Sequence, residues 1–176
     1  MEIDLRQHAF STPELPEGYF VEPWNPALLE SHATAHYLSF RNTPDARLFG
    51  NFQTFRGCRK VMENIVKRYN FCPAATHLIV YHPTGAFHTE CAATIQGVIH
   101  ADGNGGIQNV GVVPAHQHRG LGHALLALAL SGYQKYGVRR ATLDVTADNE
   151  KALGLYRNIG FIVTQVYYRE ATPRQQ

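Results

Sequence analysis

The pattern of apolar and polar positions predicts a short strand and two helices in the first part of the chain. The strand covers residues 19–24. The first helix runs from residue 26 to about 40, because Asn25 can cap a helix that has Pro26 in its first turn. The second runs from about 55 to 69, where apolar residues recur at helical spacing and Arg and Lys occupy the other side. Such an amphipathic helix is expected to pack on a sheet.

A run of strands follows the second helix. Residues 77–81 and 91–99 are strand-like and are joined by a turn sequence at 83–85, so they are expected to form a hairpin. A glycine-rich turn at 102–106 then leads to a third strand over residues 107–113. The three strands are predicted to form an antiparallel meander.

Beyond Pro114 the pattern alternates between helix and strand. The predicted elements are a helix, a strand, a helix and a strand at residues 120–136, 141–146, 149–158 and 161–168. This order is typical of a βαβαβ arrangement, in which the first crossover makes its two strands parallel. The predicted fold class is therefore α/β. It has one central mixed sheet that is mostly antiparallel, with a parallel pair in the C-terminal half and helices on both faces.

Length and the two ends of the chain predict the domain organisation. A chain of 176 residues, 44% of them hydrophobic, fits one compact domain. Residues 1–17 contain prolines and polar residues without periodicity, so we expect an extended N-terminal arm. The single domain is then expected at residues 18–170, followed by a tail at 171–176.

Composition argues against several classes of function. A formal net charge of +2 is too small for a protein that draws its affinity from many phosphate contacts, so no nucleic-acid partner is expected. No apolar run approaches the roughly 20 residues that span a bilayer, and the start lacks a signal-peptide pattern. We therefore expect no membrane association and a cytoplasmic location. The three cysteines have no C-x-x-C spacing and the histidine pairs lack a third ligand, so no metal is expected.

A glycine-containing loop stands between the strand at 107–113 and the next helix. Its sequence at residues 117–122 is Gln-His-Arg-Gly-Leu-Gly. Glycine lets a ligand approach the backbone, and the free N–H groups of a helix N-terminus favour an anion, so a pyrophosphate would fit. The two glycines can equally make only a tight turn. A Rossmann site is disfavoured because its motif needs a glycine where this chain has Leu125.

A second group of candidate residues lies in the helix predicted at 149–158. Asn149, Ala152 and Tyr156 fall on one stripe of that helix, at positions i, i+3 and i+7. Two plainer interpretations stay open. Asn149 can serve only as the N-cap, and Tyr156 can be an ordinary aromatic residue at a helix–sheet contact.

Two strings in the chain resemble motifs of the GNAT superfamily of N-acetyltransferases. Residues 117–122 are similar to its acyl-CoA signature Q/R-x-x-G-x-G/A, and residues 149–161 are similar to N-x-x-A-x-x-L-Y-x-x-x-G-F. The resemblance is strong from about residue 107 to 161 and covers only the order of elements before that. It implies a GNAT-like acyl-CoA N-acyltransferase fold. It also implies transfer of an acetyl group from acetyl-CoA to a primary amine, by direct attack in a ternary complex.

The resemblance further implies which residues bind the cofactor. Backbone amides from the loop and the helix start would hold the CoA pyrophosphate, the strand before Pro114 would face the pantetheine and acetyl group, and the later helix would add contacts. The cofactor-binding residues implied in this way are Val110, Gly111, Val112, Gln117, His118, Arg119, Gly120, Leu121, Gly122, His123, Asn149 and Ala152.

The implied chemistry needs an acid and a base. By resemblance, Tyr156 protonates the departing CoA thiolate. An amine is cationic at neutral pH, so a base must remove a proton first, and Asp144 is the candidate, acting through a water, with Asn109 or a histidine as alternatives. A backbone N–H of a bulged strand would polarise the carbonyl, with Gly111 as the bulge position. The alternative function is a non-catalytic acyl-CoA-binding or regulatory module, which would bind CoA without turnover.

The end of the chain departs from the GNAT pattern. After Phe161 that family usually has two strands, whereas this pattern supplies one, and the missing strand would normally cover one side of the acceptor site. A partner subunit in a homodimer could complete that edge. The amine acceptor, a small molecule or a protein, is not identified by the sequence.

Overall fold

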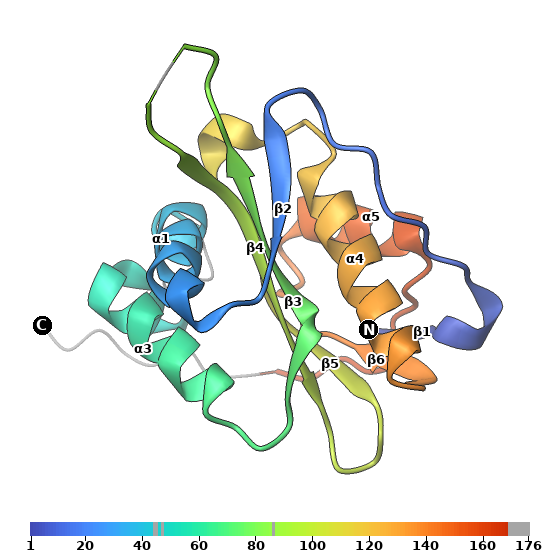
Figure 1. Ribbon diagram of the computed structural model, residues 1–176. Coiled ribbons are helices and arrows are strands. Elements are labelled where there is room, and N and C mark those ends of the chain that lie inside the picture. The colour runs from blue at the N-terminus through green and yellow to red at the C-terminus, as the bar shows by residue number, and fades with distance from the viewer. Residues whose placement is uncertain (44–45, 47, 86, 169–176) are drawn as a thin grey trace, which may run out of the picture.

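A six-stranded mixed sheet organises the part of the chain that the structure describes (Figure 1). The computed structural model describes residues 1–43, 46, 48–85 and 87–168. The strand order is β1-β6-β5-β4-β3-β2, and only β5 and β6 are parallel. The strands are β1 (Glu2–Asp4), β2 (Tyr19–Pro23), β3 (Phe71–Tyr81), β4 (Glu90–Ile99), β5 (Gly105–Val112) and β6 (Arg140–Thr142). The predicted α/β class, with its parallel pair in the C-terminal half, is confirmed.

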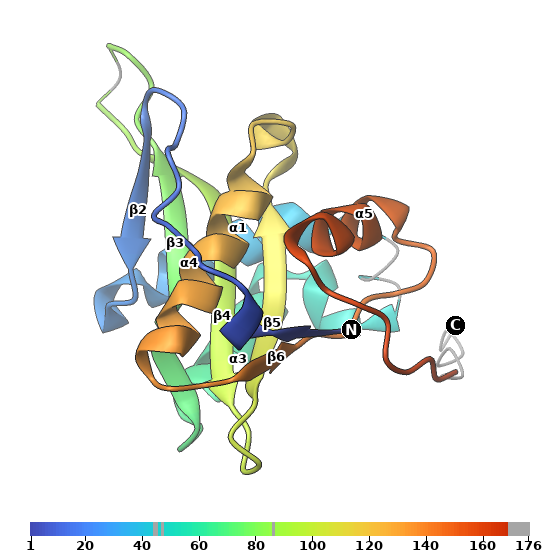
Figure 2. The same cartoon turned by 90° about the vertical axis from the view of Figure 1, so that its right-hand side faces the viewer.

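Helices cover both faces of this sheet. On one face lie α1 (Leu29–Phe40) and α3 (Phe55–Val66), and on the other lies α4 (Leu121–Lys135), with α5 (Glu150–Ile159) beside it (Figure 2). Within the described residues, short 3-10 turns lie between these elements at Leu5–Gln7, Pro26–Leu28, Gly50–Gln53 and Pro114–His116. The four predicted helices are confirmed as α1, α3, α4 and α5, with ends that differ by a few residues.

The main hydrophobic core lies between α4 and the sheet. Leu125, Leu126 and Leu130 of α4 are fully buried there. The contact is close, because a Cβ on Gly132 would stand 1.9 Å from the carbonyl oxygen of Ala74 in β3. A helix seated this tightly has a fixed axis, so its first turn is held in one place relative to the end of β5.

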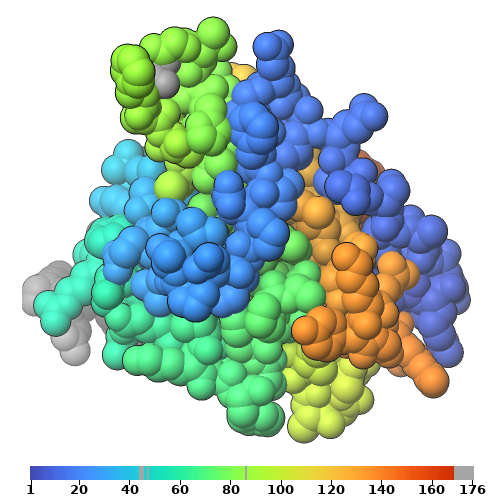
Figure 3. Space-filling model, viewed as in Figure 1, coloured from blue at the N-terminus to red at the C-terminus, as the bar shows by residue number. Residues whose placement is uncertain are grey.

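The N-terminus corrects the prediction of an unpacked arm at residues 1–17. Residues 2–4 form β1, which pairs with β6, and the side chains of Ile3 and Leu5 are each 2% exposed. Gln134 of α4 donates hydrogen bonds to the carbonyl oxygens of Leu5 and His8, both at 2.8 Å, and Figure 3 shows the segment lying against α4. The prediction failed because a strand of three residues is too short to show an alternating pattern.

The C-terminal strand predicted at 161–168 is wrong for the residues described. Only Ile162 pairs, and it exchanges two backbone hydrogen bonds of 2.9 Å with Glu2. β1 therefore lies between β6 and Ile162. Because β1 is so short, its antiparallel register offers no strand partner to residues 163–168, which carry no helix or strand. The last residues of the expected domain and its tail, 169–176, lie outside the described part.

Candidate active site

β5 carries an irregularity in the middle of the sheet. In its register with β4, Thr94 pairs with Gly111 and Gln96 with Gln108, so Ile95 alone stands opposite two residues of β5. This is a β-bulge at residues 109–110, just before the position predicted for it. The glycine at 111 has a packing reason instead, since a Cβ there would lie 2.8 Å from the Ser39 Cβ atom of α1.

β5 and β6 run together only at their beginnings. Their parallel ladder holds two residue pairs, Gly105 with Ala141 and Gly106 with Thr142. β6 then ends, while β5 continues to Val112. The strands therefore separate towards their carboxyl ends, which is where open α/β sheets place their ligands. This separation of β5 from its parallel neighbour is the arrangement expected for a strand that offers its backbone to a ligand.

The loop after β5 leaves backbone N–H groups unused at the start of α4. Gly120 has φ +77° and caps α4 without any side-chain hydrogen bond, and the first helical bond runs from Ala124 N–H to the Gly120 oxygen at 3.0 Å. The N–H groups of residues 121–123 thus have no helical acceptor. His118 has φ +62°, a left-handed conformation that costs a non-glycine residue about 1 kcal/mol or more. Together these features fit an anion held by the backbone.

Side chains fix this loop to the end of β5. Gln117 donates a hydrogen bond from Nε2 to the Val112 carbonyl oxygen at 3.2 Å. A Cβ on Gly122 would lie 3.0 Å from Leu155 Cδ2 and 3.7 Å from Val112 Cγ2, so β5, α4 and α5 meet at this glycine. The backbone around Gly120 is open by contrast, with nothing within 4 Å of a Cβ placed there.

A buried histidine that the sequence reasoning did not use holds the base of the loop. His116 Nδ1 lies 2.8 Å from the Tyr19 hydroxyl, and its Nε2 lies 3.3 Å from a carboxylate oxygen of Glu90. Burial lowers the pKa of His116, against the opposing effect of Glu90. In the neutral ring the Tyr19 hydroxyl donates to Nδ1, and Nε2–H donates to Glu90. These partners come from β2 and β4, so no local sequence signal could have identified them.

The residues predicted on α5 and after β6 have diverse environments. Asn149 Oδ1 accepts a hydrogen bond from Ala152 N–H at 3.2 Å, so Asn149 does cap α5. Tyr156 is buried, with its ring 6.0 Å from that of Phe161. Asp144 is exposed, one residue beyond the buried Leu143. The helix thus brings Tyr156 into the core beside α4, while Asp144 faces solvent.

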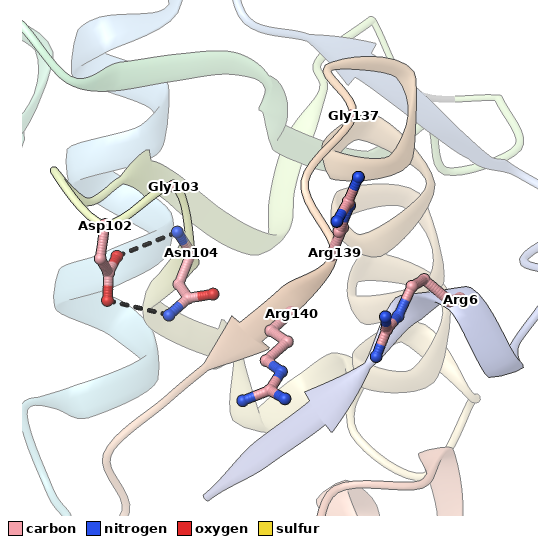
Figure 4. A pocket seen from close by; sticks show the side chains of 7 residues that line it. All are labelled: Arg6, Asp102, Gly103, Asn104, Gly137, Arg139 and Arg140. Atoms are coloured by element: carbon pink, nitrogen blue, oxygen red, sulfur yellow. Dashed lines mark hydrogen bonds between the residues drawn. The ribbon is translucent and has the colours of Figure 1, made fainter.

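A cavity of about 420 Å³ lies at the far end of the sheet from this loop (Figure 4). Its lining consists of Arg6, Asp102, Gly103, Asn104, Gly137, Arg139 and Arg140. Arg6 pairs with Asp4 and Arg140 with Glu2, and Asp102 accepts two hydrogen bonds from Asn104. This cavity is at the amino ends of β5 and β6, so it is separate from the site at their carboxyl ends.

A second cavity, of about 290 Å³, lies beside the start of α4. It is lined by residues 8–11 and Pro13, by His123 and Ala127 of α4, and by Asn158 and Ile159 at the end of α5. His123 is also one of the residues expected to bind the cofactor, so this cavity adjoins the unused N–H groups of the loop.

Metal and membrane features are absent from the residues that the structure describes. Within the described ranges, no group of three or more His, Cys, Asp or Glu side chains could hold a metal ion. No described helix combines the length and the apolar character that crossing a bilayer requires.

Comparison with known proteins gives the same fold and family. A mycothiol acetyltransferase of Streptomyces avermitilis is 34% identical over 96 residues, which cover 51% of this chain and 31% of that protein. A GCN5-related N-acetyltransferase structure from Sphaerobacter thermophilus superposes with a TM-score of 0.64 and 27% identity, covering 90% of this chain and 45% of the other. The chain thus spans less than half the length of either protein.

A third relative shares the fold at lower identity. The structure of the Escherichia coli ribosomal-protein-S18-alanine N-acetyltransferase has a TM-score of 0.62 and 20% identity, with 84% of this chain and 79% of that chain covered. Residues 52–161, well over half of the sequence, match the Acetyltransferase (GNAT) family. These residues contain the bulged β5, the loop and α5, and on this evidence the chain belongs to the GNAT acetyltransferase family.

Proposed function

We propose that this protein transfers an acetyl group from acetyl-CoA to a primary amine. The observation that carries the proposal is the junction of β5 and α4, where a strand that has separated from its parallel neighbour leads into an uncapped helix N-terminus. Uncapped N–H groups bind a diphosphate, and the separated strand leaves room for an extended thiol arm beside its backbone.

Each end of acetyl-CoA then has a place. The pyrophosphate lies on the N–H groups of residues 118–123, and the pantetheine and acetyl group lie along Val110 to Val112. Asn149 and Ala152 add contacts from α5. A backbone N–H of β5 donates to the thioester oxygen and stabilises the charge that develops on it.

The proposed reaction is direct attack by the amine on the thioester. The ammonium form loses a proton to water, assisted by Asp144, and the nitrogen lone pair then forms the C–N bond. The C–S bond breaks, and Tyr156 donates a proton to the CoA thiolate. Tyr156 is buried, which suits an acid that must act on a thiolate away from bulk water.

The acceptor is proposed only as a primary amine. The relatives named above act, by their names, on a mycothiol compound and on an alanine of a ribosomal protein. One is a small molecule and the other a protein, so they define no single acceptor for this chain.

The test combines CoA binding with turnover. We expect isothermal titration to show CoA binding, and thiol release from acetyl-CoA with an acceptor set of an alanyl peptide amide, glucosamine and spermine. Tyr156→Phe should retain CoA affinity and lose about 100-fold or more in kcat, the range of general acid catalysis. Tyr69→Phe is the matched control, since Tyr69 is 93% exposed. Absence of CoA binding would refute the proposal, and CoA binding without turnover of any of these amines would favour the alternative, a non-catalytic acyl-CoA module.

A further inference from the structure

A line of hydrogen-bonded side chains crosses the α1 face of the sheet and ends at the β5 bulge. Asn109 Nδ2 donates to Gln96 Oε1 at 3.3 Å, and Gln96 Nε2 donates to Thr94 Oγ1 at 2.6 Å. The Thr94 oxygen lies 2.8 Å from His32 Nδ1, on α1. His32, Thr94 and Gln96 are completely buried, while Asn109 is partly exposed. Each of the three buried side chains has a hydrogen bond within this line, which offsets part of the cost of burying it, while His32 Nε2 is buried without a partner among the described residues.

The line has a direction. Because the Thr94 oxygen accepts from Gln96, its own proton is available for His32 Nδ1. Burial, with a smaller effect of His77, lowers the pKa of His32 to about 3, so the ring is neutral and has one accepting nitrogen. Every junction then has one donor and one acceptor, running from Asn109 to His32. This arrangement fixes which way the Asn109 amide faces, with its nitrogen towards Gln96.

The free end of the line is an oxygen. Among the described residues, no hydrogen bond to Asn109 Oδ1 is formed, while its nitrogen is engaged. Asn109 lies in the bulge beside Val110, and it shares the α1 side of β5 with Gly111, which packs on Ser39. Val110 and Val112 pack on the opposite side, in the α4 core. An oriented acceptor therefore stands next to the part of β5 where the proposed thioester lies.

We propose that Asn109 Oδ1 receives an N–H of the acceptor amine, and that Gln96, Thr94 and His32 are positioning residues that hold this oxygen in place. The inference rests on the proposed function. An ammonium or amine needs an acceptor for its protons, and orientation of the nucleophile is a large part of catalysis by a ternary complex. Asn109 takes up no proton, because an amide oxygen is not a base at neutral pH. The proton leaves through water and Asp144 as above.

The first test is a pair of substitutions in the middle of the line. Thr94→Val removes both the acceptor for Gln96 and the donor to His32, and Thr94→Ser keeps them. We expect Thr94→Val to lower kcat/KM for the amine about tenfold, the loss of one oriented hydrogen bond, while the CoA dissociation constant is unchanged. Thr94→Ser should restore most of that loss. Thr34→Val is the control, because the Thr34 hydroxyl bonds the Glu30 carbonyl oxygen on the outer part of α1.

A second pair acts at the accessible end, in case Thr94→Val fails to fold. Asn109→Leu should give the same loss in kcat/KM, and Asn109→Asp, which keeps an oxygen but loses the N–H that Gln96 accepts, should recover only part of that loss. The amine in all assays is whichever of the alanyl peptide amide, glucosamine and spermine gives the highest rate. Long-range ¹H–¹⁵N NMR at pH 7 provides a separate readout. It should show His32 protonated on Nε2 only, and the Thr94→Val substitution should shift the Nδ1 resonance of His32.

The outcomes separate this inference from the proposed function. Failure of CoA binding refutes the proposed function and takes the inference with it. Intact CoA binding with equal rates for Thr94→Val and Thr94→Ser, or for Asn109→Leu and Asn109→Asp, overturns the inference alone. So does a His32 ring protonated on Nδ1. If CoA binds but none of the three amines is acetylated, the role of Asn109 in catalysis is overturned while the NMR result still reports on the line.

Discussion

At the scale of single residues, the loop at 117–123 depends on backbone conformation more than on side chains. His118, Arg119 and Gly120 are exposed, and two of them have left-handed backbones. Nothing in the described structure lies within 4 Å of a Cβ placed on Gly120. The conformation therefore serves the space in front of the loop, where the diphosphate is proposed to bind, rather than packing behind it.

Substitution of Gly120 tests this interpretation. We expect Gly120→Ala to destabilise the protein by about 1 kcal/mol, the cost of a left-handed alanine, and also to weaken CoA binding, because the new methyl group points into the ligand's space. Gly103→Ala is the matched control, since Gly103 has φ +81° and equally open surroundings in the β4–β5 turn. Urea unfolding should show a similar loss for both variants. Equal CoA affinities in titrations of the two variants would contradict the assignment.

The sequence predicts part of this site for a physical reason. Glycines and an N-capping residue act locally, so their spacing identified the loop and placed Asn149 at the start of α5. The Tyr19 bond to His116 and the line from His32 to Asn109 depend on which elements become neighbours. Such contacts have no signature in a local pattern, so the sequence could not reveal them.

At the scale of elements, β1 is the clearest difference between expectation and structure. It comes from the N-terminus but occupies the sheet position between β6 and Ile162. The sequence pattern had left one side of the acceptor site short of a strand. In the structure, three residues from the other end of the chain pair with β6 on one side and with Ile162 on the other.

Alanine substitutions of two isoleucines, Ile3 and Ile162, test how firmly β1 is packed. Ile3 is 2% exposed and Ile162, which pairs with the same strand, is 65% exposed. We expect Ile3→Ala to lower the free energy of unfolding by about 2–4 kcal/mol, the usual cost of a cavity in a core. Ile162→Ala should cost about 0.5 kcal/mol or less. If urea unfolding found both substitutions equally mild, residues 1–17 would be a loose arm after all.

At the scale of the whole molecule, most of the sheet could be predicted, including its β2 edge, but the opposite edge formed by β6, β1 and Ile162 could not. Hydrophobic periodicity depends on burial along each element, so it predicted the meander, the parallel pair and helices on both faces. Strand length depends on which partner is available. For that reason β6 ended earlier than predicted and the strand at 161–168 was reduced to one residue pair.

Two buried histidines couple the stability of the whole fold to pH. His32 and His36, on the face of α1 that packs against the sheet, are fully buried, and burial lowers the pKa of His32 to about 3 and that of His36 to about 4. Their unfolded-state pKa is 6.5. Below pH 6.5 the unfolded chain therefore binds protons that the folded chain does not. The stabilisation from the two neutral histidines is complete above pH 6.5. As the pH falls it is lost down to about pH 4 for His36 and about pH 3 for His32.

This proton linkage predicts how steeply the free energy of unfolding falls with pH, and the substitution His36→Leu should reduce that slope. Each histidine contributes about 1.4 kcal/mol per pH unit between pH 6 and 4 to the fall in the free energy of unfolding. His36→Leu removes one titrating group from the contact with Phe40 and Phe52, so its slope should be smaller by about that amount. His88→Leu, at a side chain that is 68% exposed, should leave the slope unchanged. Urea unfolding at pH 7, 6, 5 and 4 measures all three slopes. If His36→Leu and the unsubstituted protein lost stability with the same slope, His36 would be protonated in the folded protein, and the contact between α1 and the sheet would be open to water.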